Sequence, residues 1–258
     1  MDIAPPADPI AAVTHPDPYP YYAELARAVR PEWNVGLGMW VVSNPAHVAS
    51  ILQHPGAHVV APSDAPAGFA EYARFNEGER HARLRAEVVE RIAGVALDDP
   101  PIATGDLDAF IERFALYALA RDQRANVKGD LLFQAYDATR ALIGNAWAAR
   151  AAEPALGAAE AVAKALRDDP PVHNTRRRLV ADIEIAGTTL QGGDAVLVVL
   201  VRTTFGMGAH ACPGDELAQR IAVMALTRLL ADGVTPSFPT GYVPRPNVRI
   251  SLFAPLPG

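Results

Sequence analysis

The chain has 258 residues with 23 basic and 29 acidic side chains, which give a formal charge of −6, and half of its residues are hydrophobic. This composition is typical of a globular protein and excludes a disordered, collagen-like or coiled-coil chain. The mildly acidic balance argues against a general nucleic-acid-binding protein.

The lengths of the apolar runs and the number of cysteines further restrict the possible classes of protein. The length is enough for one large domain or two small ones around a sizeable core. No apolar run reaches about 18 residues, which argues against a membrane-spanning helix, and the first residues lack the basic and apolar regions of a signal peptide. The single cysteine, Cys212, excludes a disulfide within the chain and a zinc site made of several thiolates. We therefore expect a cytoplasmic protein in a reducing compartment.

The spacing of apolar and helix-breaking residues predicts a mainly helical fold with a small β portion. Residues 1–20 are rich in proline, alanine and aspartate and predict an irregular lead-in. Asn44 is a candidate N-cap, and Ala186-Gly187 is a candidate hairpin turn. Helices are predicted over residues 21–29, 45–52, 79–95, 107–120, 131–152, 158–166 and 216–230. Strands are predicted over residues 39–43, 182–185, 188–190, 195–201 and 248–253, and a loop over residues 56–68.

One segment carries the strongest indication of chemistry. Residues 205–214 read Phe-Gly-Met-Gly-Ala-His-Ala-Cys-Pro-Gly and lead into a predicted helix. Gly206 and Gly208 leave the backbone free for left-handed conformations and for a close approach to a ligand. Cys212 lies just before the helix, whose positive end favours a thiolate, and this thiolate is a candidate nucleophile or metal ligand. The alternative is a glycine-rich connection that carries an inert thiol.

This segment resembles the heme-binding signature of the cytochromes P-450. The resemblance implies that heme b (iron protoporphyrin IX) is the cofactor and that the Cys212 thiolate is its proximal iron ligand. It also implies a single heme-binding domain over residues 1–258 with a contracted cytochrome P-450-like fold. The matching positions are Phe205, Gly206, Gly208, His210, Cys212 and Gly214, followed by Leu217-Ala218.

The resemblance extends to the residues that would bind the heme propionates. Residues 79–85 look like the helix that supplies a histidine and an arginine for this purpose, here His81 and Arg85. Because they are four residues apart, they share one helix face and can bind one anionic group together. The alternative for these two residues alone is a solvated helix face.

Two further propionate-binding positions follow from the same resemblance. Residues 174–187 look like the segment that supplies another arginine, and we match this role to Arg177, with Arg176 as the alternative. His210 holds the last such position. Four donors for two carboxylates are reasonable, because buried anions need hydrogen-bonded partners of opposite charge.

The central predicted helix resembles the distal helix of the family, where an acid and an alcohol relay protons to iron-bound dioxygen. The family usually places the acid directly before the alcohol, whereas Ala138 separates Asp137 from Thr139 here. Either Thr139 keeps the role of the alcohol with a displaced acid, or Ala138 occupies its place. The alternative is two ordinary polar residues on a helix.

Two departures from the family pattern matter. Residues 164–167 read Lys-Ala-Leu-Arg where the family has Glu-x-x-Arg, so the usual buried ion pair cannot form. We expect Glu160, four residues before Lys164, to pair with it at the surface. Only residues 202–204 connect the predicted strand 195–201 to Phe205, and the chain between Arg85 and residue 131 is too short for the usual lid helices. We therefore expect a shortened member of the family.

The resemblance implies a heme-thiolate oxidoreductase of the monooxygenase type. It would insert oxygen into a small organic substrate, with electrons from separate ferredoxin- and reductase-type proteins, or with peroxide instead. The competing hypothesis is a non-catalytic heme-binding relic that acts as a sensor, a carrier or a partner subunit, which the shortening and Lys164 favour. If contraction leaves heme exposed, two chains would associate into a homodimer.

Overall fold

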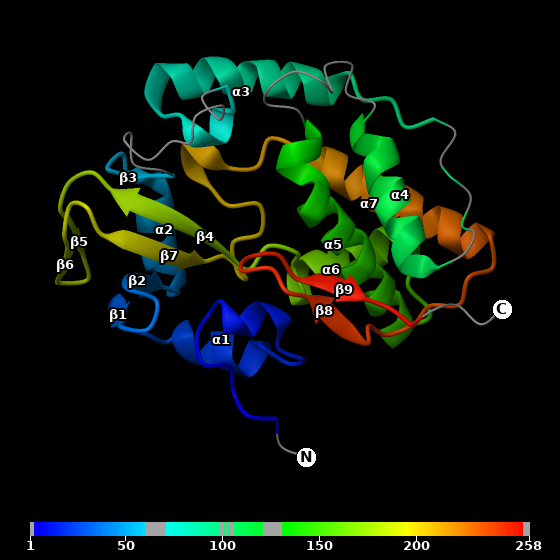
Figure 1. The fold of residues 1–258 in the computed structure, drawn as a ribbon, viewed down its shortest axis with the longest axis horizontal. Coiled ribbons are helices and arrows are strands. Elements are labelled where there is room, and N and C mark those ends of the chain that lie inside the picture. The colour runs from blue at the N-terminus through cyan, green and yellow to red at the C-terminus, as the bar shows by residue number, and fades with distance from the viewer. Residues whose placement is uncertain are drawn as a thin grey trace. The chain divides into compact units, whose positions relative to one another are not determined.

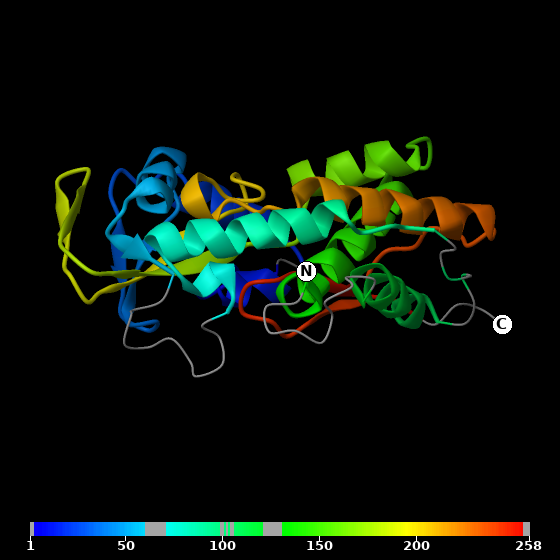
Figure 2. The same ribbon diagram turned by 90° about the horizontal axis from the view of Figure 1, so that it is seen from above.

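The computed structural model describes residues 3–59, 71–98, 101, 103, 106–120 and 131–254 (Figures 1 and 2). The chain divides into two compact units, one formed by Met1–Ala86 with Val172–Cys212 and the other by Glu87–Pro171 with Pro213–Gly258. The first unit contains the largest sheet, and the second contains the longest helix. The chain is thus mainly helical with a small β portion, as the sequence predicts.

The sheet of the first unit has five strands in the order β1-β2-β7-β4-β3. The central strand β7 is parallel to β2 and antiparallel to β4 (Figure 1). The sheet therefore joins the beginning of the chain to the segment that leads into the cysteine loop. The strand bounds are β1 Glu32–Asn34, β2 Met39–Val42, β3 Ala57–His58, β4 Asn174–Leu179 and β7 Ala195–Val199.

Both faces of β7 are covered, which explains why this strand is apolar throughout. Val196 and Val198 pack in a cluster with helix α2 (Pro45–Gln53), whereas Leu197 and Val199 pack with helix α1 (Tyr19–Leu25). Successive side chains of a strand point to opposite faces, so the two helices lie on opposite sides of the sheet.

The helix cap and the hairpin turn that the sequence predicts in the first unit are both present. Asn44 caps α2, because its side-chain oxygen accepts a hydrogen bond of 3.0 Å from the Ala46 N–H. Strands β5 (Ile183–Ile185) and β6 (Thr188–Leu190) pair as a hairpin. Ala186 and Gly187 form its turn with φ of 50° and 73°, the left-handed conformation of a two-residue turn.

Helix α5 is the centre of the second unit. It contacts α4, α6, α7 and strand β9, and its buried side chains include the fully enclosed Trp147. Helix α3 (Gly78–Ala93) contains the boundary between the units, after Ala86. The remaining bounds are α4 Leu107–Ala120, α5 Leu131–Ala152, α6 Ala158–Asp168, α7 Asp215–Ala231, β8 Gly241–Val243 and β9 Ile250–Leu252.

Buried polar side chains connect β9 and its neighbours to α5 and α6. Asn145 accepts a hydrogen bond of 2.9 Å from the Ser251 hydroxyl and donates one of 2.9 Å to the Asp169 carbonyl. Arg249 is 2% exposed, with its guanidinium 3.5 Å from the centre of the Tyr242 ring and 3.0 Å from the Asp169 carboxylate. These contacts fix the strand segment to the helices, since each buried polar group requires its partner.

The structure corrects several sequence expectations. Helix α1 ends at Leu25, so Val29 is 79% exposed instead of lying on an apolar helix face. Donors of the segment that follows β2 bind carbonyl oxygens at and beyond the end of the helix: the Ser43 hydroxyl binds Leu25 O, and the Asn44 amide binds Ala28 O. The lead-in also contains a 3₁₀ turn, Ala11–Thr14.

Four strands were not predicted from the sequence: β1, β3, β4 and β8. The most important is β4, which carries three consecutive arginines, Arg176 to Arg178, and so lacks an apolar alternation. Pairing with the apolar β7 creates this strand. Most of the predicted loop over residues 56–68 lies outside the described residues.

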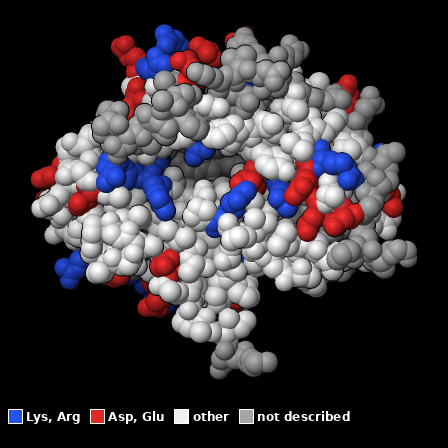
Figure 3. Space-filling view, in the orientation of Figure 1, with Lys and Arg blue, Asp and Glu red and all other residues white. Residues whose placement is uncertain are grey.

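Two properties of the described residues bear on partners. No described helix is both long enough and apolar enough to cross a membrane. On the face shown in Figure 3, described basic and acidic side chains lie next to one another in small groups.

Candidate functional site

The cysteine loop of the first unit has an unusual backbone. Phe205, Gly206 and Gly208 all have positive φ, of 67°, 70° and 72°. Backbone hydrogen bonds close the loop: the Cys212 N–H donates to Phe205 O at 2.8 Å, and the Gly206 N–H donates to Thr203 O at 2.9 Å. A left-handed conformation at a phenylalanine costs on the order of 1–3 kcal/mol, and such strain is found mainly at functional sites.

The loop is anchored on the end of α2. A Cβ on Gly208 would lie 2.8 Å from Leu52 O, so only glycine fits there without a shift of backbone. Met207 packs against the cluster beside α2, and the Gln53 amide lies 3.6 Å from its sulfur. The close approach at Gly208 is thus made by the backbone of Leu52, and an approach to a ligand stays a prediction.

Cys212 is the last residue of the loop, and it is exposed. Gly214 belongs to the second unit, where it precedes α7 with a φ of −111° and is the N-terminal flanking residue of that helix. An exposed cysteine at the end of a loop closed by backbone hydrogen bonds has a defined backbone position. This arrangement favours a ligand or nucleophile over an inert core thiol.

Helix α3 binds the cysteine loop through two side chains. His81 is 5% exposed, and its ring nitrogens face Ala73 O at 2.9 Å and Ala209 O at 3.0 Å. Arg85, one turn further on, donates from Nη1 to Ala211 O at 2.5 Å. The structure thus brings both predicted residues to the carbonyl oxygens on either side of His210.

The rings of His81 and His210 lie with their centres 4.1 Å apart. His210 Nε2 is 2.8 Å from a carboxylate oxygen of Glu77, and the His210 side chain is only 11% exposed. Three of the four predicted propionate-binding residues, His81, Arg85 and His210, therefore lie in one cluster of the first unit.

Arg177 on β4 is the fourth predicted residue, and it is 5% exposed, whereas Arg176 is exposed. Its Nη1 donates to Arg176 O at 2.8 Å and to the Thr175 hydroxyl at 3.2 Å, and no described carboxylate forms an ion pair with it. Burial lowers the pKa of the Arg177 guanidinium; the Glu77 charge opposes this effect, and Arg74 adds to it. A buried guanidinium without an ion-pair partner is costly, so this position is suited to an anionic ligand.

Glu77 was missed by the sequence reasoning. Its carboxylate accepts hydrogen bonds from His210 Nε2 at 2.8 Å and from the Val59 N–H at 3.0 Å. Burial, the largest influence, raises the pKa of Glu77, but these two hydrogen bonds and the charges of His210 and His58 bring it below its ordinary value. Its position four residues before His81 is the only sequence signal that could have indicated a shared face.

The two predicted distal residues lie on α5 in the second unit, and the structure does not bring them together. Thr139 is 2% exposed, whereas the Asp137 carboxylate is 2.9 Å from the Arg245 guanidinium near the surface. Residues two apart on a helix are separated by about 200° around its axis. Ala138, the alternative position for the alcohol, is half-buried.

The expected pair between Glu160 and Lys164 is wrong. Lys164 Nζ instead binds Asp168 at 2.8 Å and Glu153 at 2.9 Å, and these hydrogen bonds, that of Asp168 first, raise its pKa. Glu160 accepts a hydrogen bond of 2.7 Å from the Gly157 N–H and so caps α6. The capping bond wins because Gly157 N–H is an unpaired donor of the first turn.

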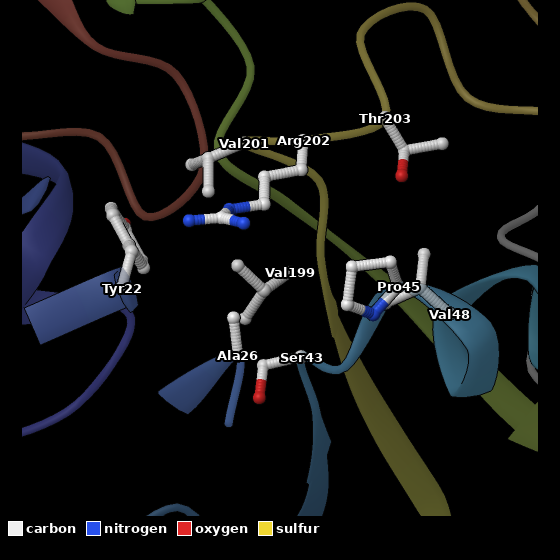
Figure 4. A pocket seen from close by; sticks show the side chains of 9 residues that line it. All are labelled: Tyr22, Ala26, Ser43, Pro45, Val48, Val199, Val201, Arg202 and Thr203. Carbon is white, nitrogen blue, oxygen red and sulfur yellow. The ribbon is translucent and has the colours of Figure 1, made fainter. Parts of the chain in front are cut away.

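Each unit also has a hollow on its surface. The first unit has a crevice lined by residues of α1, α2 and the end of β7, with the Arg202 guanidinium turned toward Tyr22 (Figure 4). This crevice leaves essentially no room for a water molecule. The second unit has a cavity of about 340 Å³ lined by α5, α6 and residues 238–242. None of the described residues that line either hollow is a predicted site residue.

No family model matches the chain, and no curated protein matches it. Solved structures do match. CalO2 is 20% identical with a TM-score of 0.65, and the match covers 98% of each chain. P450 RauA, solved with a biosynthetic intermediate of aurachin RE, is 17% identical with a TM-score of 0.64 over 95% of this chain and 96% of its own. CYP109E1 from Bacillus megaterium, solved with corticosterone, is 14% identical with a TM-score of 0.60 over 91% of this chain and 96% of its own.

The chain has a cytochrome P450-like fold. For such a fold the first unit offers a chemically suitable donor set for heme: an accessible thiol, and a buried arginine that forms no ion pair with a described carboxylate. Histidines and a second arginine surround the cysteine loop. Sulfur for iron and cations for carboxylates are the donor types that heme requires, so these residues fit the cofactor.

The glycine geometry gives a first prediction. Gly208→Ala should lower the free energy of unfolding by about 2–4 kcal/mol, since it adds both a strained positive φ and a contact with Leu52 O. Gly206→Ala is the matched control, because it has nearly the same φ in the same loop but no atom within 4 Å of the added Cβ. It should cost only about 1–2 kcal/mol. Chemical denaturation measures both, and equal losses would contradict the close contact.

Proposed function

We propose that the protein is a heme-thiolate oxidoreductase of the cytochrome P450 type, with Cys212 as the iron ligand. The observation that carries the proposal is the attachment of the cysteine loop to α3: His81 lies 3.0 Å from Ala209 O, and Arg85 lies 2.5 Å from Ala211 O. These bonds hold the exposed thiol next to a basic cluster, and heme needs both features together.

Four residues would bind the heme propionates. Arg177 is buried and forms no ion pair with a described carboxylate, so a propionate would supply its counter-charge. Arg85 and His210 lie around the cysteine loop and add donors for the second carboxylate. His81 would join them by exchanging one of its two carbonyl contacts for the carboxylate. Charge-assisted hydrogen bonds of this kind are about twice as strong as neutral ones.

Heme b, when bound, supplies the oxygen chemistry, and a thiolate ligand favours cleavage of the O–O bond. The protein positions the Cys212 sulfur through the closed loop and excludes solvent from Arg177 through burial on β4. On α5, the buried Thr139 hydroxyl is the better candidate to hold a proton, because the Asp137 carboxylate already pairs with Arg245. A small organic substrate would be oxygenated, with electrons from separate redox proteins or with peroxide.

A non-catalytic heme protein is the second candidate, acting as a sensor, carrier or partner subunit. Two observations favour it. Lys164 occupies the position of the family acid and pairs with Glu153 and Asp168 near the surface. Asp137 forms an ion pair with Arg245 rather than a contact with Thr139. Both features depart from the arrangement that the resemblance to the family implies.

The ligand assignment predicts a spectrum. Purified protein supplied with hemin, reduced and exposed to carbon monoxide should show the Soret band of thiolate ligation. Cys212→Ala should abolish this band, because no other cysteine is present. A colourless protein, a nitrogen-ligated spectrum, or a band unchanged in Cys212→Ala would contradict the proposal.

The choice between Arg177 and Arg176 predicts a difference in hemin affinity. Arg177→Gln should weaken hemin binding about tenfold, the effect of one lost charge-assisted hydrogen bond. Arg176→Gln, on the adjacent and exposed position of β4, is the matched control and should leave the affinity unchanged. Titration followed by the Soret band measures both. If only Arg176→Gln weakened hemin binding, Arg176 would be the propionate-binding arginine.

Analysis of reaction products distinguishes a catalytic protein from a non-catalytic heme protein. We expect hemin-loaded protein, given surrogate ferredoxin and reductase or given peroxide, to oxygenate members of a panel of small substrates. The loaded protein without donor and the Cys212→Ala variant are the controls. Full heme loading without any oxygenated product would favour the non-catalytic candidate.

A further inference from the structure

The carboxylate of Glu77 lies among the basic groups that the proposed function assigns to the heme propionates. One of its oxygens is 2.8 Å from His210 Nε2, and the other accepts a hydrogen bond of 3.0 Å from the Val59 N–H. Its charge also acts on the buried Arg177 and favours the charged guanidinium. Glu77 therefore makes the type of contact that a propionate would make there.

Each of these N–H groups can donate one strong hydrogen bond. The His210 Nε2 position carries a single N–H, and a hydrogen bond to Glu77 withdraws it from any second carboxylate. A second carboxylate placed nearby would also be repelled by Glu77, because like charges in a partly buried site interact strongly.

The Glu77 carboxylate can move away from His210. Its side chain is 31% exposed, whereas that of His210 is 11% exposed, so solvent is within reach of the carboxylate while the imidazole stays enclosed. Glu77 also directly precedes Gly78, the first residue of α3, where φ is +59°. Exchange of His210 for water at the Glu77 carboxylate therefore needs rotation of the partly exposed Glu77 side chain alone.

We propose that Glu77 is a built-in competitor of a heme propionate: the two carboxylates are alternative acceptors for the single N–H of His210 Nε2. The proposal rests on the proposed heme-binding function and deepens it. Glu77 is a positioning residue in this scheme, because its competition for His210 sets the affinity for the cofactor.

The test compares hemin affinities by Soret titration. Glu77→Gln should bind hemin about tenfold more tightly than the wild-type protein, because a weaker neutral hydrogen bond to His210 replaces the charge-assisted one. Glu79→Gln is the matched control: it removes the same charge two residues away, at an exposed position. It should leave the affinity unchanged.

Hemin dimethyl ester distinguishes competition from a general change in the site. Both of its propionates lack charge, so the advantage of Glu77→Gln over wild type should disappear with this ligand. A Glu77→Gln protein that binds hemin no more tightly than wild type, or that keeps its advantage with the ester, overturns the proposal. Absence of the thiolate spectrum in all proteins would instead refute the heme function itself.

A measurement on the wild-type chain covers the case in which Glu77→Gln does not fold. Carbodiimide-coupled labelling of carboxylates, read by peptide mass spectrometry, should modify Glu77 faster after hemin is added, since its carboxylate then faces solvent. Labelling of Glu79 is the internal reference and should not change. Equal or slower labelling of Glu77 after hemin addition would overturn the proposal.

Discussion

The structure of the candidate site depends on the attachment of α3 to the cysteine loop. His81 and Arg85 donate to the carbonyl oxygens of Ala209 and Ala211, and these two bonds hold the backbone directly before Cys212. The loop itself is strained at Phe205. Strained backbone persists only where surrounding contacts overdetermine it, and the helix supplies them.

A second constraint is the charge balance of the same cluster. Arg177 is buried, His210 is nearly so, and Glu77 provides negative charge between them. A basic cluster of this kind is unfavourable unless anions compensate for it. Under the proposed scheme the cluster has two alternative counter-ions, Glu77 within the chain and a propionate brought by heme, and their competition sets the affinity for the cofactor.

The second unit shows where the chain departs from the sequence pattern of the cytochromes P-450 that it resembles. The acid of the Glu-x-x-Arg pattern is absent, and Lys164 forms pairs with Glu153 and Asp168 instead. The buried ionic contact of this unit is made elsewhere, by Arg249 with Asp169 beneath the Tyr242 ring. The proposed heme-binding residues lie in the first unit, whereas the departures from the pattern lie in the second, so heme binding and catalysis require separate experiments.

The sequence by itself determined the features that depend on neighbouring residues. It located α4 and α5, the cap at Asn44 and the turn at Ala186-Gly187, because periodicity and turn chemistry act over a few positions. The motif also identified the cysteine loop. The distal pair stays a prediction, and the structure places Thr139 and Asp137 on different sides of α5.

Only the tertiary structure decided the features that join distant segments. Strand β4 exists because β7 pairs with its arginines, Ser43 binds the last carbonyl oxygen of α1, and Glu77 meets His210 across more than half of the chain. No local pattern encodes such contacts, since their energy comes from burial and from partners that folding brings together.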